Sequence, residues 1–145
     1  MAAFRRRRAL AASCIVGLAT GLGACTGPAG PACAPGVTTP MAVFTLYFGK
    51  AIAGRGDLTE QEWQSFLDDT VSANLPNGYT VLDANGAWLN PATRKTAREA
   101  TKVVVAAMPE TPDSSAAIER VRRAYQARFK QLAVGMTVEQ ACGAF

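Results

Sequence analysis

The sequence contains no histidine. Hydrolytic triads and dyads that use an imidazole base are therefore excluded, and so are most zinc, copper and iron sites, because these depend on imidazole ligands. The carboxylates of Asp68 and Asp69 could bind a cation, but adjacent positions of a helix diverge around its axis. We expect a solvated helix face at that pair, and we expect neither a metal ion nor a cofactor in this protein.

Acidic residues are absent before Asp57, whereas four arginines, Arg5 to Arg8, follow one another near the amino terminus. The whole chain has 15 basic and 11 acidic residues, so without these four arginines it has 11 of each. The surplus positive charge therefore belongs to a short leading segment and not to a binding surface. We expect no nucleic-acid partner, since the remainder is neutral and residues 94–108 lack the stacking aromatics of RNA-binding sheets.

The leading segment also lacks an apolar stretch long enough to cross a bilayer. Its apolar run, from Ala9 to Leu22, is shorter than the roughly 20 residues that are needed. The run follows the four arginines and ends in Leu22-Gly23-Ala24-Cys25. A charged start, a short apolar middle and small residues before a cysteine are typical of an export signal and resemble the lipobox of bacterial lipoproteins. We predict a lipoprotein-type signal peptide at residues 1–24 and lipidation of Cys25. Ordinary signal cleavage and a retained membrane anchor are the alternatives.

Lipidation of Cys25 predicts a location in the cell envelope, where the protein is lipid-anchored to a membrane and faces the extracytoplasmic side. The lipid membrane is then a partner, bound through the acylated Cys25. Residues 25–40 contain four prolines with several glycines and threonines, a composition typical of a partly extended, lipidated tether. Residues 41–145 are long enough to form one domain with a hydrophobic core.

Strand signals alternate with helix signals along residues 41–145. Apolar or β-branched runs predict strands at 41–48, 79–88, 94–108 and 136–145. Asn85-Gly86 interrupts the second of these runs, and there we predict a bulge rather than a hairpin turn.

Helices are predicted in the two longer of the three gaps between these strands, residues 49–78 and 109–135. The first begins at a capping box, Thr59 to Glu62, and is stopped at Pro76. The second begins at Thr111-Pro112-Asp113, carries a buried apolar stripe that extends to Leu132, and is stopped at Gly135.

The resulting order, β-α-β-β-α-β, predicts an α+β fold. With right-handed crossovers the expected arrangement is a ferredoxin-like sandwich, in which a four-stranded antiparallel sheet in the order 4-1-3-2 has both helices on one face. The last strand then lies beside the first and runs the other way, which brings Cys142 near Cys33. In an exported, oxidising location we predict a disulfide between them, closing a loop of about 110 residues; two unpaired thiols are the alternative.

A polar group surrounds the start of the third expected strand, near Trp88. Its basic residues Arg94, Arg98 and Lys102 are candidates for binding a carboxylate or phosphate, with Glu99 positioning the cation. The alternative is a set of cross-strand charge pairs at an exposed sheet end, with no ligand.

Both faces of the expected sheet are apolar. Val43 and Tyr47 oppose Phe44 and Phe48 along the first strand, and Val103 and Val105 alternate with Val104 and Ala106 along the third. Because the helices cover only one face, something else is expected to cover the other. A second copy of the chain, an envelope protein and a small apolar ligand are the candidates, beside an uncovered patch.

Several short segments together resemble a bacterial family known as domain of unknown function 3574. They are Leu46-Tyr47-Phe48-Gly49, Glu62-Trp63-Gln64-Ser65-Phe66-Leu67, Gly78-Tyr79-Thr80-Val81-Leu82-Asp83, Gly86-Ala87-Trp88, Arg98-Glu99-Ala100-Thr101-Lys102-Val103 and Tyr125-Gln126-Ala127-Arg128-Phe129. The resemblance covers residues 41–145 and supports that domain boundary. Members often look like small exported lipoproteins with a late cysteine, which fits Cys25 and Cys142, and the family implies no activity.

Two hypotheses for function follow. The first is a membrane-tethered exported lipoprotein that acts as a non-enzymatic binding or assembly module through an apolar sheet face. The second is a small enzyme of the dimeric α+β barrel type, with a pocket between sheets and Tyr47, Glu99 and Lys102 as acid-base candidates. We favour the first, because no group of residues forms a recognisable catalytic pattern.

Overall fold

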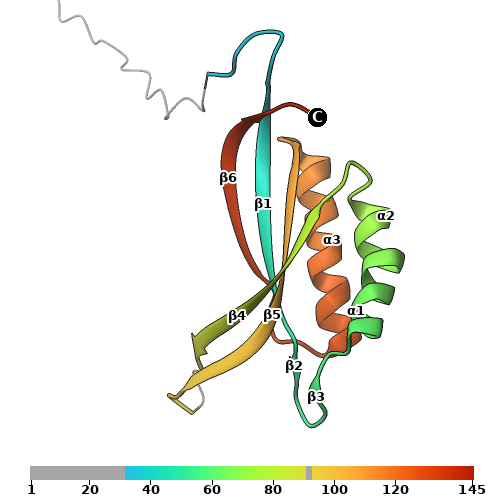
Figure 1. Ribbon diagram of the computed structural model, residues 1–145, viewed down its shortest axis with the longest axis vertical. Helices are drawn as coiled ribbons and strands as arrows, with labels where there is room; N and C mark the ends of the chain where they lie inside the picture. The colour runs from blue at the N-terminus through green and yellow to red at the C-terminus, as the bar shows by residue number, and fades with distance from the viewer. Residues whose placement is uncertain (1–31, 91–92) are drawn as a thin grey trace, which may run out of the picture.

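The computed structural model describes residues 32–90 and 93–145 (Figure 1). The predicted signal peptide, residues 1–24, and the predicted lipidation site, Cys25, lie outside the described residues. None of the helices in the described ranges is long and apolar enough to cross a membrane.

Four strands form one antiparallel sheet in the order β4-β5-β1-β6, which is the predicted 4-1-3-2 order. Their bounds are β1 Thr39–Gly49, β4 Thr80–Leu89, β5 Thr96–Pro109 and β6 Gly135–Gly143. A hairpin of two short strands, β2 Ala51–Ile52 and β3 Gly56–Asp57, precedes the first helix and was not predicted.

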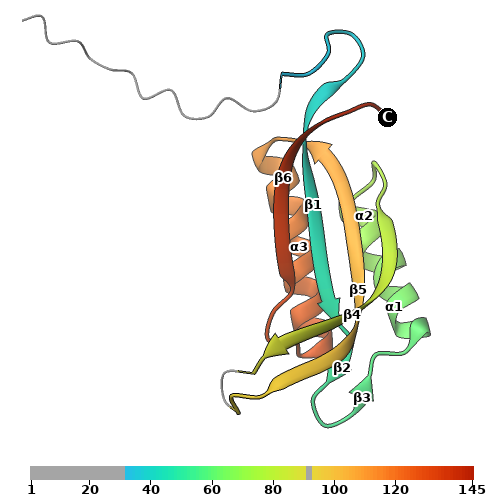
Figure 2. The ribbon, with the colours of Figure 1, turned by 60° about the vertical axis from the view of Figure 1, so that its left-hand side comes forward.

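The helix layer packs on one face of this sheet (Figures 1 and 2). It consists of a helix in three parts, α1 Glu60–Phe66, the π-helical turn η1 Leu67–Val71 and α2 Ser72–Asn74, followed later in the chain by α3 Pro112–Phe129. The capping box predicted at Thr59 is present, since Glu62 and Thr59 exchange hydrogen bonds between side chain and backbone. The π turn was not predicted; it leaves both Leu67 and Val71 buried.

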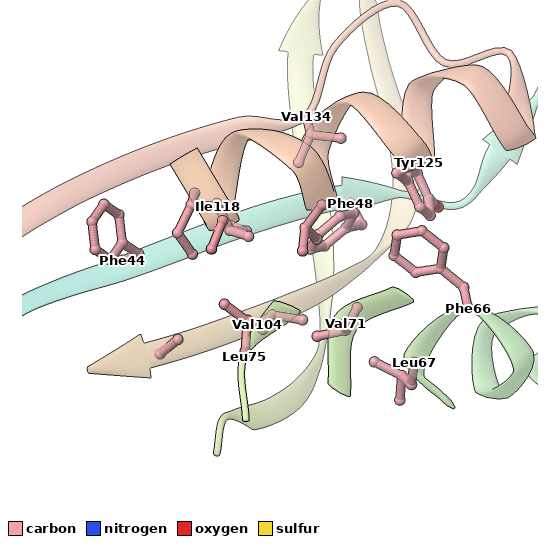
Figure 3. Packing of buried hydrophobic residues seen from close by; sticks show 14 of the residues in the cluster. Phe44, Phe48, Phe66, Leu67, Val71, Leu75, Val104, Ile118, Tyr125 and Val134 are labelled. Carbon is pink, nitrogen blue, oxygen red and sulfur yellow. The ribbon is translucent and has the colours of Figure 1, made fainter. Parts of the chain in front are cut away.

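The core lies between the sheet and the helices (Figure 3). Alternate residues of β1, from Ala42 to Phe48, are at most 4% exposed and face the helices, as a strand with one covered face requires. At one end of the core, five aromatic rings pack in tilted or edge-to-face contacts with centroids 4.8 to 6.2 Å apart: Phe48, Trp63, Phe66, Tyr125 and Phe129.

The predicted bulge at Asn85-Gly86 is wrong. Strand β4 pairs with β5 in one unbroken register, from Thr80 opposite Val105 to Leu89 opposite Thr96. Gly86 serves a different purpose, because a Cβ there would lie 2.8 Å from the hydroxyl of Thr101 on the neighbouring strand. The missing side chain makes room for this threonine and breaks no pairing.

The predicted end of the second helix is also wrong. Helix α3 ends at Phe129, because Lys130 adopts a left-handed conformation with φ of 53° and its N–H bonds the carbonyl of Gln126. Leu132 is therefore outside the buried stripe and 91% exposed, and Gly135 begins β6 instead of stopping the helix.

The predicted disulfide is confirmed: Cys33 and Cys142 are bonded, with their Cα atoms 5.4 Å apart. Cys142 lies opposite Pro40 on the β1–β6 ladder. A turn before β1, in which the N–H groups of Val37 and Thr38 bond the carbonyl of Ala34, leads the chain back toward it. The last eight residues of the predicted tether, 33–40, are thus fastened to the domain.

Candidate functional site

The sheet face opposite the helices, here called the open face, carries exposed apolar side chains. Register places Tyr47 and Leu82 on either side of Val103 on this face, and Trp88 lies further along β4 opposite Ala97. The exposed fractions are 42% for Tyr47, 50% for Leu82 and 41% for Trp88. Val103 is 9% exposed yet lies outside the core cluster, because its neighbours on the open face shield it. The sequence prediction of two apolar faces therefore describes this sheet.

A groove with a volume of about 850 Å³ lies at one end of the open face. The ends of β4 and β5 nearest their connecting loop bend away from the helix layer (Figure 1), and Trp88 and Glu99 line the groove from this bent arm. Tyr47, Gly49 and Thr101 line it from the sheet. The start of the β2–β3 hairpin and the loop between α3 and β6 complete it with Ala51, Ile52, Ala53, Lys130, Gln131, Leu132 and Ala133.

The carboxylate of Glu99 lies directly over the backbone of Gly49. A Cβ at Gly49 would be only 2.6 Å from Glu99 Oε2, so this position requires a glycine for the carboxylate to sit where it does. The N–H of Ala51 donates to the same oxygen at 3.3 Å. Glu99 was predicted as a site residue, whereas the role of Gly49 was missed. The glycine that ends the Leu46-Tyr47-Phe48-Gly49 run is the one signal that could have indicated it.

Tyr125 fixes this segment from the core side. Its hydroxyl donates to the carbonyl of Gly49 at 3.0 Å, and its side chain is fully buried. Burial raises the pKa of Tyr125, and the negative charge of Glu99 raises it further. The hydroxyl therefore keeps its proton and remains a donor, which holds Gly49 beneath the Glu99 carboxylate.

Lys102 lies on the opposite face of β5 from Glu99, against the helix layer. Its side chain is 6% exposed, and its ammonium contacts Asp83 Oδ1 at 2.5 Å and Glu60 Oε2 at 2.8 Å. Burial alone would lower the pKa of Lys102, but its hydrogen bonds to Asp83 and Glu60 outweigh burial and raise it. Hydrogen bonds from Lys102 and then Lys50 lower the pKa of Glu60.

The structure thus does not bring together the three acid-base candidates. Tyr47 and Glu99 share the open face, whereas Lys102 is enclosed with two carboxylates on the covered face. The proposed anion-binding set is also dispersed. Arg94 lies in the β4–β5 loop in a left-handed conformation, and Arg98 is exposed four residues before Lys102, about 13 Å away along the strand. The ammonium of Lys102 is already neutralised.

The acidic pair Asp68 and Asp69 makes local contacts. Asp68 accepts a hydrogen bond from Gln64 at 2.9 Å, and Asp69 lies 3.3 Å from Arg128 of α3. Across residues 32–90 and 93–145, no group of three or more Cys, Asp or Glu side chains is arranged to hold a metal ion.

The sheet order, the helix layer and the open face define a ferredoxin-like α+β domain. The chain belongs to the family described as "Protein of unknown function (DUF3574)", whose sequence pattern matches residues 44–145.

Solved structures with the same fold are distant in sequence. A phage SAM lyase in complex with S-methyl-5'-thioadenosine aligns with a TM-score of 0.56 at 9% identity, covering 71% of this chain and 90% of the lyase. The apo form of a phage SAM lyase aligns with a TM-score of 0.53 at 11% identity, covering 68% and 79%. CutA from Synechococcus elongatus aligns with a TM-score of 0.48 at 12% identity, covering 72% and 80%. The two lyase alignments establish a shared fold alone. The chain has no significant match among curated proteins.

Proposed function

We propose that this protein is an exported lipoprotein, anchored to a membrane through acylated Cys25, that binds or assembles through the open face of its sheet. The observation that carries this proposal is the uncovered face, where Tyr47 and Leu82 are about half exposed on either side of a shielded Val103, and Trp88, 41% exposed, lies further along β4. Adjacent exposed apolar side chains of this size are typical of interaction surfaces.

The disulfide supports the export part of the proposal. Bonds of this kind persist in oxidising compartments outside the cytoplasm. The bond also shortens the tether, because Cys33 is fastened to the domain and lies eight residues after Cys25. Eight extended residues span at most about 28 Å, so the anchor would hold the domain close to the membrane surface.

Lipidation is tested by labelling with a fatty acid in a bacterial host that processes lipoproteins. We expect wild-type protein to incorporate the label and to fractionate with membranes. Cys25→Ser should lose both properties, whereas Cys14→Ser, which changes the other cysteine of the leading segment, should keep them. Label on the Cys25→Ser protein, or none on the wild type, would refute the anchor.

A second copy of the chain is the occupant of the open face that we propose to test first. A two-fold interface is self-complementary, and anchoring in a membrane concentrates identical copies with the same orientation. Sedimentation equilibrium of residues 26–145 should give a dimer. Leu82→Glu should shift it toward monomer, and Ala127→Glu, at an exposed position of α3, should not. A wild-type monomer at every concentration would exclude self-assembly and leave an envelope protein or a ligand as the occupant.

A further inference from the structure

We propose that the groove at the end of the open face binds a small organic ammonium ion, with Glu99 as counter-charge and the rings of Trp88 and Tyr47 as walls. This inference rests on the proposed role of the open face as a binding surface and names the chemistry of a ligand for it.

The charge balance of the carboxylates favours a cationic ligand at Glu99. Three carboxylate side chains in the described part of the chain are half-buried: Glu62, Glu99 and Glu119. Glu62 is paired with Arg55 and Glu119 with Arg122. Glu99 has no basic side chain within 4 Å among residues 32–90 and 93–145, and one backbone N–H at 3.3 Å satisfies only part of its acceptor capacity. A partly desolvated carboxylate of this kind favours a cationic ligand.

The aromatic side chains of the groove also favour an organic cation. Trp88 is a diagonal cross-strand neighbour of Glu99, because Gly86 lies opposite Glu99 and Trp88 points to the same face. Tyr47 is on the other side, two residues before the glycine over which the carboxylate lies. Both rings thus line the same groove as the carboxylate, Trp88 from β4 and Tyr47 from β1. Aromatic rings attract organic cations, and a groove that combines such rings with a carboxylate is suited to an alkylammonium ion.

The size and rim of the groove limit the ligand to a small, singly charged ion. About 850 Å³ is ample for an organic ion and is within the usual range for small-molecule sites. Ile52 and Leu132 add apolar lining, while Lys130 and Arg98 also border the groove. These two cations disfavour ligands with several positive charges. The ligand that fits is singly charged, with an ammonium group directed to Glu99 and apolar substituents toward the rim.

The two tryptophans provide a direct readout. Trp88 is in the groove, whereas Trp63 is 3% exposed in the core, so the two indole N–H signals of a ¹⁵N-labelled protein report different places. Residues 26–145 are suitable for this experiment, because the core cluster lies within residues 42–134 and the disulfide is retained. The probes are choline and 3,3-dimethylbutan-1-ol, which has the same shape without the charge.

We expect choline to shift the Trp88 signal and leave that of Trp63 in place, with binding at least tenfold tighter than that of the alcohol. Glu99→Gln should abolish this preference by weakening choline binding at least tenfold. Glu139→Gln, which removes a charge from an exposed site on β6, should leave it unchanged. Phosphatidylcholine vesicles distinguish the source of the cation: co-sedimentation would assign a lipid headgroup, and binding of free choline alone would assign a soluble ligand.

Equal affinity of the wild type for choline and the alcohol would overturn the inference without any variant. Choline affinity unchanged in a folded Glu99→Gln protein would overturn it too. Neither result bears on the proposed function, because the tests of that function use substitutions at Cys25 and at Leu82. Leu82 lies outside the groove.

Discussion

At the residue scale, two charged side chains of β5, Glu99 and Lys102, lie in different environments. Lys102 is enclosed with Asp83 and Glu60, and its pairing is complete within the described residues. Glu99, three positions earlier on the opposite face, is half-buried beside a groove, and among residues 32–90 and 93–145 its carboxylate accepts a hydrogen bond only from the N–H of Ala51. An odd spacing along a strand places two side chains on opposite faces, so this separation could have been predicted from the numbers 99 and 102.

Substituting Lys102 should lower the free energy of unfolding less than substituting its two partners, Glu60 and Asp83. Lys102→Met takes away a buried charge and leaves two exposed carboxylates, so we expect a loss of less than about 1 kcal/mol in unfolding free energy. Glu60→Gln combined with Asp83→Asn leaves a buried ammonium unpaired. This double variant should lose about 2–3 kcal/mol, somewhat less than a fully buried pair because both carboxylates are exposed. Urea denaturation measures both, and the opposite ranking would contradict this account of the cluster.

The capping box should weaken in acid. The guanidinium of Arg55, followed by the backbone N–H and hydroxyl of Thr59, lowers the pKa of Glu62 to about 2. Its stabilising contribution is therefore present above the ordinary pKa of about 4.5 and is lost as the pH falls toward 2. Glu62→Gln should flatten the pH dependence of the unfolding free energy between these values. Denaturation curves at pH 2 to 5 test this, and identical slopes for both proteins would exclude the contribution.

At the scale of elements, local signals predicted the order of strands and helices, and long-range geometry decided the rest. The Thr59 and Thr111 caps were predictable because each uses residues within one turn. The end of α3 was not, because Lys130 takes the left-handed position that glycine usually occupies. The place of Gly49 under Glu99 also escaped prediction, since it depends on the register between β1 and β5.

Two neighbouring valines of β5 should differ in how strongly a charged substitution destabilises the domain. Val104 is fully buried against the helices, whereas Val105 is half-buried on the open face. Val104→Glu should destabilise the domain by more than about 3 kcal/mol, because it buries an unpaired carboxylate. Val105→Glu should cost about 1 kcal/mol or less. Thermal unfolding followed by circular dichroism measures this difference. Comparable losses in protein kept monomeric by Leu82→Glu would mean that the open face is covered within a single copy of the domain.

At the scale of the whole molecule, the disulfide joins the two ends of the domain. It links residues 109 positions apart and fastens the segment before β1 to the end of β6. Its position followed from the sequence because the 4-1-3-2 order places the last strand beside the first. The groove could not be predicted in this way, since its lining comes from strand ends, a hairpin and a loop that are far apart in the chain.

Loss of this bond should lower stability substantially. For a loop of this length the chain-entropy model gives about 4–5 kcal/mol. The Cys33→Ser, Cys142→Ser double variant should therefore unfold at a markedly lower denaturant concentration than the oxidised wild type, and reduced wild type should match the variant. If oxidised and reduced proteins unfold at the same midpoint, the bond does not constrain the unfolded chain.

The anchored domain should meet its partner through the open face. Photo-crosslinking in intact cells tests this, with the photoreactive amino acid placed at Leu82, on the open face, or at Ala127, on the exposed side of α3. We expect a discrete crosslinked species from position 82 and none from position 127. Crosslinks from position 127 with none from position 82 would contradict it.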